Sequence, residues 1–173
     1  MSRVSDKIKK IKVLALDVDG VLTDGKIVLD SRGEETKNFD VKDGFALVLL
    51  KHAGFKTAII TARASKVVSL RAKDLNMDKV YQDAFPKMGA YQALLRHFKV
   101  KDENVCFVGD DLPDIQVLKR VGFSVAVSNA VPEVKKAADY VTKNKGGNGA
   151  VREIIELILK TQGKWQKTFS TYA

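Results

Sequence analysis

Four groups of residues in this sequence have side chains suited to catalysis or metal binding. Asp17 and Asp19 belong to an Asp-Val-Asp-Gly-Val motif, and a hydroxyl and an amine follow at Thr61 and Lys87. The fourth group is the run 109–114, Gly-Asp-Asp-Leu-Pro-Asp. Each group alone has an ordinary structural explanation, because threonines cap helices, lysines are mostly solvated and acids favour helix N-termini. The combination is what indicates chemistry.

Carboxylates gathered in one place favour a bound cation, since like charges repel and shift one another's pKa values. Hard oxygen ligands favour Mg²⁺ over zinc, and Mg²⁺ with a lysine and a hydroxyl suits a phosphoryl group. A carboxylate can also attack phosphorus and form a covalent intermediate. An EF-hand calcium loop shares the Asp-x-Asp-Gly pattern but needs an oxygen ligand and a Glu where this sequence has Val21 and Val28. The calcium loop is therefore excluded.

The elements that position these groups can be traced along the chain. Short apolar runs without polar alternation predict buried strands at residues 13–18, 56–60, 80–81, 105–108, 123–127 and 140–142. Helices are predicted at 44–53 behind Asp43, at 66–76 behind the capping Ser65, from Pro86, at 111–121, from Pro132 and at 150–162. The pattern predicts an α/β fold with a doubly wound, mostly parallel sheet, whose ligands bind beyond the carboxyl ends of the strands.

Three segments depart from this alternation. Residues 26–39 predict a β-hairpin around the turn-forming residues 30–33. The tail, residues 163–173, has three aromatic side chains and predicts either a disordered end or a segment that docks on a neighbouring subunit. The first twelve residues carry five cations and one acid, which predicts a solvated arm. No linker interrupts the chain, so we expect residues 1–173 to form one domain.

The composition narrows the classes of protein. Among 173 residues, 30 Lys and Arg face 21 Asp and Glu, and the net charge of +9 suits nucleic acid, a membrane surface or an anionic substrate. The single cysteine, Cys106, excludes an internal disulfide and is expected to be an inert core thiol. No apolar run approaches the ~20 residues that span a bilayer, and the N-terminus lacks a signal sequence, so we predict a cytoplasmic protein.

The four motifs, in this order, resemble those of the haloacid dehalogenase-like (HAD) phosphatases. The resemblance implies a Rossmann-like core in which Asp17 is phosphorylated and Asp19 is the general acid and base. The acid at position 19 favours phosphate esters over carbon–halogen bonds, because an alkoxide leaving group needs a proton. Mg²⁺ would be held by Asp17, the backbone carbonyl of Asp19 and Asp110. By the same resemblance Thr61 and Lys87 would bind the phosphoryl oxygens.

Two further acids of the fourth motif have a supporting role by the same resemblance. Asp111 and Asp114 would hold the metal shell and its loop in place without binding the metal directly.

Longer motifs resemble a narrower family. The stretches 24–27, 33–39 (Gly-Glu-Glu-Thr-Lys-Asn-Phe), 43–44 and 146–153 look like those of the 3-deoxy-D-manno-octulosonate 8-phosphate (KDO 8-phosphate) phosphatases. This implies hydrolysis of KDO 8-phosphate, in lipopolysaccharide synthesis, by a homotetramer without a cap domain. In that family the hairpin lies at the tetramer axis and the tail reaches a neighbour's active site. The 18 residues between Asp24 and Asp43 agree, because they suffice for a hairpin but not for a lid domain.

The implied substrate carries a phosphate at one end and a carboxylate at the other. Arg63 is our candidate for the carboxylate, because guanidinium groups pair with carboxylates through two hydrogen bonds; a surface arginine at a helix start is the alternative. The resemblance adds substrate contacts at Lys42, Asp43, Gly44 and Arg71. Relatives that act on nine-carbon sugars, of the KDN 9-phosphate type, tend to carry an acid where Arg63 stands, so Arg63 favours the eight-carbon substrate.

Two other classes of protein share features with this sequence. A phospho-acceptor regulatory domain also uses Asp, Thr, Lys and Mg²⁺, but its metal-binding acids precede a mid-chain phosphorylated Asp, whereas here the Asp-x-Asp motif comes first. A nucleic-acid-binding module rests on the net charge alone, with no base-reading motif. We therefore predict a small sugar-acid phosphate as the partner, and neither nucleic acid nor membrane.

Overall fold

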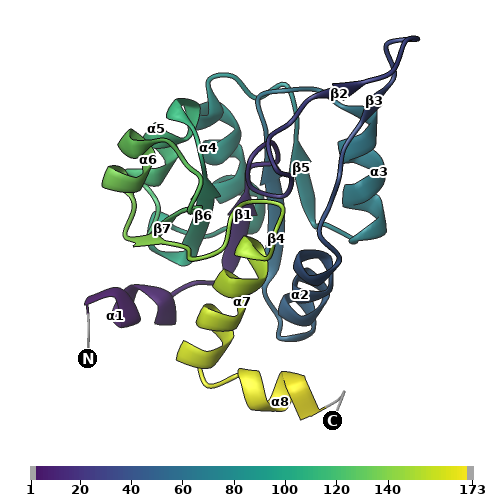
Figure 1. Cartoon of the computed structure of the whole chain (residues 1–173). Coiled ribbons are helices and arrows are strands. Elements are labelled where there is room, and N and C mark those ends of the chain that lie inside the picture. The colour runs from purple at the N-terminus through teal and green to yellow at the C-terminus, as the bar shows by residue number, and fades with distance from the viewer. Residues whose placement is uncertain (1–2, 171–173) are drawn as a thin grey trace.

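The computed structural model describes residues 3–170, and its centre is a six-stranded sheet. The strands follow the order β5-β4-β1-β6-β7-β8 and every neighbouring pair is parallel (Figure 1). Their bounds are β1 Val13–Leu16, β4 Lys56–Ile60, β5 Lys79–Tyr81, β6 Val105–Gly109, β7 Phe123–Ala126 and β8 Tyr140–Val141. The predicted doubly wound sheet is confirmed, and each predicted strand is found at its expected place.

Helices cover both faces of the sheet. Helices α2 (Val41–His52) and α7 (Ala150–Thr161) pack side by side on one face, while α4 (Lys87–Phe98), α5 (Ile115–Leu118) and α6 (Pro132–Ala137) cover the other. The remaining helical segments are α1 Arg3–Lys9, α3 Lys66–Asp74, α8 Trp165–Phe169 and the 3₁₀ turns η1 Asp102–Asn104 and η2 Leu112–Asp114. The central strands are consequently buried on both sides, and Cys106 is the core thiol that was expected.

The helix boundaries follow their caps. Ser65 caps α3 as predicted, accepting from the Val68 backbone N–H. Asp40, and not Asp43, caps α2, because its carboxylate accepts from the backbone N–H groups of Lys42 and Asp43. The helix predicted over 111–121 is shorter than expected: its first turn is the 3₁₀ turn η2, and α5 ends at residue 118.

The N-terminal segment corrects a prediction. Residues 3–9 form helix α1 rather than a solvated arm. Ile8 and Ile11 are buried in the core, and Lys7 pairs with Asp139 at 2.5 Å between Nζ and Oδ1. The apolar residues Val4, Ile8 and Ile11 are spaced as one helix face, a stripe that the surrounding lysines conceal in the sequence.

The C-terminal segment is also helical where it is described. Trp165 in α8 packs on the core, with the Arg152 guanidinium carbon 5.5 Å from the centroid of its ring. The hypothesis of a disordered end is therefore wrong for residues 165–169. The tail aromatic Tyr172 lies outside the described residues.

The segment 26–39 forms the predicted hairpin. Strands β2 (Val28–Leu29) and β3 (Glu35–Thr36) are antiparallel, and the Asp30 carboxylate accepts from two backbone N–H groups of the turn. The hairpin projects from the body of the molecule (Figure 1). Within residues 3–170, no helix has the length and apolar character required to cross a bilayer.

Candidate active site

The site lies where the strands of the central sheet end. Asp17 follows β1, Thr61 follows β4 and Asp110 follows β6, while Lys87 is the first residue of α4. Because these strands are parallel, their carboxyl ends meet at one edge. A cavity of about 240 Å³ opens there, and it is lined by Asp17, Asp19, Gly25, Thr61, Ala62, Arg63, Lys87, Asp110, Asp111, Pro113 and Asp114. The strand–helix alternation thus gathers the four sequence motifs into one cavity.

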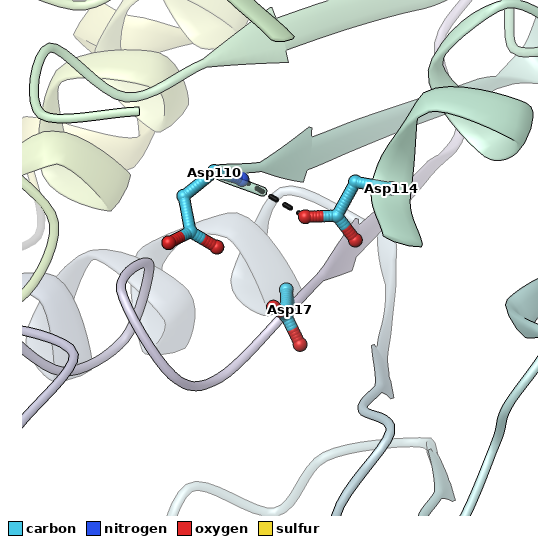
Figure 2. Close-up of side chains that lie close together, drawn as sticks. All are labelled: Asp17, Asp110 and Asp114. Carbon is cyan, nitrogen blue, oxygen red and sulfur yellow. Dashed lines mark hydrogen bonds between the residues drawn. The ribbon is translucent and has the colours of Figure 1, made fainter. Parts of the chain in front are cut away.

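Three carboxylates of this cavity form what we call the acidic triad: Asp17, Asp110 and Asp114. One oxygen from each lies within 4.8 Å of the others, and Figure 2 shows their carboxylates grouped at the ends of two neighbouring strands. Asp114 is fully buried and already occupied: its Oδ2 accepts from the Asp110 backbone N–H at 2.9 Å, and its Oδ1 accepts from Lys87 Nζ at 2.6 Å. Asp114 therefore fixes the loop that carries Asp110 and orients the lysine.

Asp17 and Asp110 have fewer hydrogen-bond partners than Asp114. Asp17 Oδ1 is 2.9 Å from Lys87 Nζ, an ion pair without hydrogen-bond geometry, and the buried Asp110 Oδ1 has no hydrogen-bond partner among the described residues. Burial, followed by the Asp114 charge, raises the pKa of Asp17 to about 6. Burial, followed by the charges of Asp17 and Asp114, raises the pKa of Asp110 to about 8. Unpartnered, hard, crowded oxygens of this kind fit a divalent cation.

Lys87 balances part of this negative charge. Its side chain is almost fully buried between Asp17 and Asp114. Burial alone would lower the pKa of Lys87, but the two carboxylates outweigh burial and raise it. The lysine is therefore a permanent cation held at the floor of the cavity. Thr61, also buried, is fixed by backbone hydrogen bonds with Tyr81 and Ala84.

Glycines allow the loops of the site to approach one another. Gly20 has a φ of +89°, and a Cβ there would lie 2.0 Å from Asp110 Oδ2. A Cβ on Gly146 would lie 1.7 Å from the Gly20 carbonyl oxygen. The glycine-rich segment 146–149 therefore packs directly on the loop after β1, and the Gly147 N–H donates to the Val21 carbonyl at 2.9 Å.

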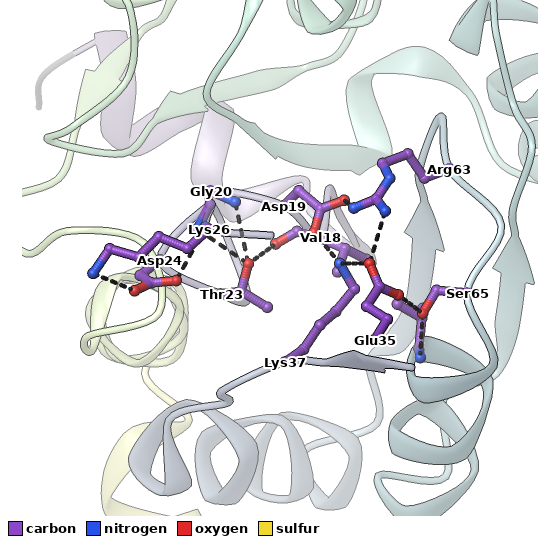
Figure 3. Close-up of polar contacts among 12 residues, drawn as sticks. Val18, Asp19, Gly20, Thr23, Asp24, Lys26, Glu35, Lys37, Arg63 and Ser65 are labelled. Carbon is purple, nitrogen blue, oxygen red and sulfur yellow. Dashed lines mark hydrogen bonds and ion pairs between the residues drawn. The ribbon is translucent and has the colours of Figure 1, made fainter. Parts of the chain in front are cut away.

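Asp19 lies outside the acidic triad, in a second charged cluster. Its carboxylate contacts Lys37 Nζ through Oδ1 and Arg63 Nη1 through Oδ2, the latter at 3.4 Å. Glu35 Oε1 closes the cluster, 2.7 Å from Arg63 Nη2 and 3.2 Å from Lys37 Nζ. Asp19, Glu35, Lys37 and Arg63 thus alternate in sign around a closed cycle, which we call the charge ring (Figure 3).

The hairpin supplies half of this ring. Glu35 lies in β3 and Lys37 follows two residues later, and Glu35 Oε2 also accepts from the Ser65 hydroxyl at 2.6 Å. Both residues belong to the family motif at 33–39, but no role is predicted for either from the sequence. Their separation of two residues, which places side chains on one side of an extended strand, was the available signal.

The predicted sugar contacts lie at different places. Arg63 lines the cavity, whereas Lys42, Asp43, Gly44 and Arg71 do not belong to its lining. The buried Asp43 carboxylate accepts from the backbone N–H groups of Gly149 and Arg152 at the start of α7, and burial raises the pKa of Asp43 to about 6. Arg71 pairs with Asp74 and packs so closely on Gly44 that a Cβ there would lie 2.4 Å from Arg71 Nη2.

Comparison with known proteins agrees with this geometry. Residues 73–154 match the family model described as haloacid dehalogenase-like hydrolase. A parallel sheet with clustered carboxylates and a buried lysine at its carboxyl edge places the chain in that class of hydrolases.

More specific similarity comes from individual relatives. The chain is 45% identical over 161 residues to the 3-deoxy-D-manno-octulosonate 8-phosphate phosphatase KdsC of Escherichia coli (strain B / BL21-DE3), covering 93% of this chain and 86% of the relative. The chain belongs to the KDO 8-phosphate phosphatase (KdsC) family and is a phosphatase.

Solved structures of relatives have the same fold. The crystal structure of 3-deoxy-D-manno-octulosonate 8-phosphate phosphatase from Moraxella catarrhalis, in complex with a magnesium ion, a phosphate ion and a KDO molecule, matches with a TM-score of 0.97 and 40% identity. The match covers 100% of this chain and 99% of that one. The cobalt-bound phosphatase from Haemophilus influenzae matches with a TM-score of 0.89 and 37% identity, covering 91% and 92% of the two chains.

Proposed function

We propose that this protein is a Mg²⁺-dependent phosphatase that hydrolyses KDO 8-phosphate to KDO and phosphate in lipopolysaccharide biosynthesis. The observation that carries the proposal is the buried pair of Asp17 and Lys87, 2.9 Å apart, beside two further carboxylates in a cavity of a KdsC-family chain. The relatives support the substrate, since the chain of known structure from Moraxella catarrhalis is in complex with magnesium, phosphate and KDO.

The reaction would have two steps, both on the phosphorus atom. Asp17 attacks phosphorus and forms an aspartyl-phosphate as the bond to the sugar oxygen breaks, and Asp19 donates a proton to that leaving oxygen. Asp19 then takes a proton from a water molecule, whose oxygen attacks phosphorus and frees Asp17 and phosphate. Thr61 and Lys87 hold the phosphoryl oxygens throughout.

The metal would be held by Asp17, the backbone carbonyl of Asp19 and Asp110. When bound, Mg²⁺ neutralises charge on the phosphoryl oxygens. Asp111 and Asp114 support this arrangement: Asp114 holds the backbone N–H of Asp110, and the Asp111 side chain accepts from the Leu112 N–H.

For the sugar, we retain Arg63 as the residue that binds the substrate carboxylate, because 41% of its side chain is exposed and it lines the cavity. Lys42, Asp43, Gly44 and Arg71 stay predictions as sugar contacts. We also propose a homotetramer acting in the cytoplasm. Its support is the hairpin, whose apolar residues Ile27 and Leu29 are 60% and 59% exposed in the single chain.

The proposal is tested by measuring phosphate release from KDO 8-phosphate and from a nine-carbon keto-deoxy sugar 9-phosphate, each with Mg²⁺ and with EDTA. We expect kcat/KM to be higher for the eight-carbon substrate and activity to disappear with EDTA. A higher kcat/KM for the nine-carbon sugar phosphate would mean that this sugar, and not KDO 8-phosphate, is the substrate. The proposed mechanism would be unaffected. Undiminished activity in EDTA would contradict the metal assignment.

A further inference from the structure

The charge ring places both oxygens of the Asp19 carboxylate against cations. Oδ1 contacts Lys37 Nζ and Oδ2 contacts Arg63 Nη1. A residue that gives a proton to the leaving oxygen and later takes one from water needs a free oxygen at the reacting centre. Opening one of the two contacts would leave an oxygen of Asp19 facing only the reacting centre.

The two contacts differ in how easily they can open. Lys37 is buried, with 1% of its side chain exposed, and it also contacts Glu35. Arg63 is 41% exposed, lines the cavity, and lies 3.4 Å from Asp19, the longest contact of the ring. An anion that enters the cavity can compete for Arg63 but cannot reach the buried lysine. The Arg63 contact is thus the one that a substrate can open.

Glu35 keeps Lys37 in place during such an exchange. It contacts both cations through Oε1, and Ser65, the cap of α3, fixes its Oε2. When Arg63 turns towards an incoming anion, Glu35 and Asp19 still hold Lys37 between them. The lysine therefore keeps its place, and so does the acid that it contacts.

Building on the proposed function, we propose that Lys37 is the positioning residue for Asp19 and that Glu35 is a specificity-determining residue. In this scheme the substrate carboxylate draws Arg63 away from Asp19 and Lys37 retains Oδ1. Oδ2 then becomes free to take a proton from water and to give it to the leaving oxygen. Recognition of the carboxylate is thereby linked to the supply of the proton. Sugar phosphates without a carboxylate leave Arg63 on Asp19 and are turned over more slowly.

The first test is Lys37→Met, assayed as kcat/KM with KDO 8-phosphate and with p-nitrophenyl phosphate. The nitrophenolate ion leaves without a proton, whereas the sugar alkoxide needs one, so a residue that acts through Asp19 affects the sugar phosphate more. We expect the loss in kcat/KM to be at least ~10-fold larger for KDO 8-phosphate than for p-nitrophenyl phosphate. General acid catalysis contributes ~10²–10⁴-fold in rate, which sets the upper limit of this difference. Lys26→Met is the matched control, because Lys26 is an exposed lysine outside the ring.

Equal losses on both substrates, or no loss on either, would overturn the role of Lys37. If Lys37→Met does not fold, Lys37→Gln retains a polar group at the position and is assayed in the same way. Turnover of p-nitrophenyl phosphate by the natural enzyme without turnover of KDO 8-phosphate would refute only the proposed substrate. The comparison would then be made with glycerol 3-phosphate as the alkyl phosphate.

The second test is Glu35→Gln. Glu35 Oε1 lies 2.7 Å from Arg63 Nη2, so its charge competes with the substrate carboxylate for Arg63, and the variant removes that charge. We expect KM for KDO 8-phosphate to fall several-fold and KM for arabinose 5-phosphate, a sugar phosphate without a carboxylate, to stay unchanged. The same change in KM for both substrates would overturn the specificity role of Glu35.

Discussion

The acidic triad and the charge ring meet at one cavity, and the loop after β1 contributes a residue to each. In the triad, Lys87 contacts two of the three carboxylates, and a buried oxygen of the third, Asp110, has no hydrogen-bond partner among the described residues. In the ring, two acids and two bases alternate, and each charged group contacts two of opposite sign. The triad has an excess of negative charge suited to a cation, whereas the ring is neutral.

This difference has a physical origin in the elements that carry each cluster. The triad lies on strand ends and on η2, which the packed sheet holds in place even though the carboxylates repel one another. The ring joins the hairpin to the loops after β1 and β4, so its ion pairs are themselves the attachment of the hairpin at the site. The packed sheet thus fixes the acidic triad, whereas the ion pairs of the charge ring fix the hairpin.

The largest expected difference between the acidic triad and the charge ring comes from removing the proposed nucleophile, Asp17. Asp17→Asn keeps the shape of the triad but loses the attacking oxygen, so we expect phosphate release to fall by about 10⁴-fold or more. The variant should stay folded, because it removes a charge from a crowded, buried site. Asp24→Asn is the control, since Asp24 pairs with Lys26 outside the cavity lining. Retained activity in Asp17→Asn would contradict the aspartyl-phosphate.

Replacement of Lys87 tests how much the stability of the acidic triad depends on this lysine. Lys87→Met leaves the buried Asp17 and Asp114 carboxylates without it, so we expect the free energy of unfolding to fall by about 3–5 kcal/mol. Lys37→Met should cost less, because Asp19 and Glu35 each keep Arg63. Denaturant unfolding of both variants gives the comparison, and equal losses would contradict the contrast between the clusters.

The pH dependence of stability provides a third comparison. The pKa values of Asp17 and Asp110 in the folded chain, about 6 and about 8, lie above their usual 3.8. Between about pH 4 and 8 the native state binds more protons than the unfolded state, so the metal-free protein should lose stability as pH rises through these values.

Asp110→Asn should flatten that pH dependence, since asparagine does not titrate. Thermal unfolding in EDTA from pH 5 to 8 measures the effect. Added Mg²⁺ should raise the melting temperature of the natural chain most at pH 8 and that of the variant little. A natural chain whose stability is level over this range, or rises with pH, would contradict the description of the triad.

The smallest expected effect concerns the support of the ring. Ser65→Ala removes the cap of α3 and the hydroxyl that contacts Glu35, and we expect a loss of about 1 kcal/mol in the free energy of unfolding. Because the ring keeps its four charges, kcat should change little. Thr36→Ala is the matched control, because Thr36 is next to Glu35 in the hairpin but lies outside the ring. A stability equal to that of the natural chain would contradict the capping role.

Much of the fold and of the strand-end cluster could be predicted from the sequence. The buried strands are short apolar runs, and the acids directly after them meet because parallel strands end at one edge. The N-terminal helix was missed because its lysines dominate the composition, although Ile8 within it and Ile11 just after it are both buried. Asp43 stays a predicted substrate contact, and no sequence pattern indicated that its carboxylate accepts from the start of α7, more than 100 residues away.

The sequence by itself determined the residue types and order of the phosphatase motifs, the α/β alternation and the hairpin, because these follow from local pattern and spacing. Only the tertiary structure decided the surroundings of each charge. Among residues 3–170 one Asp110 oxygen has no hydrogen-bond partner, Lys37 is buried against Asp19, and Arg63 contacts two acids. The physical reason is that burial and ion pairing depend on which distant segments meet, and it is the folded sheet that brings the strand ends to the hairpin.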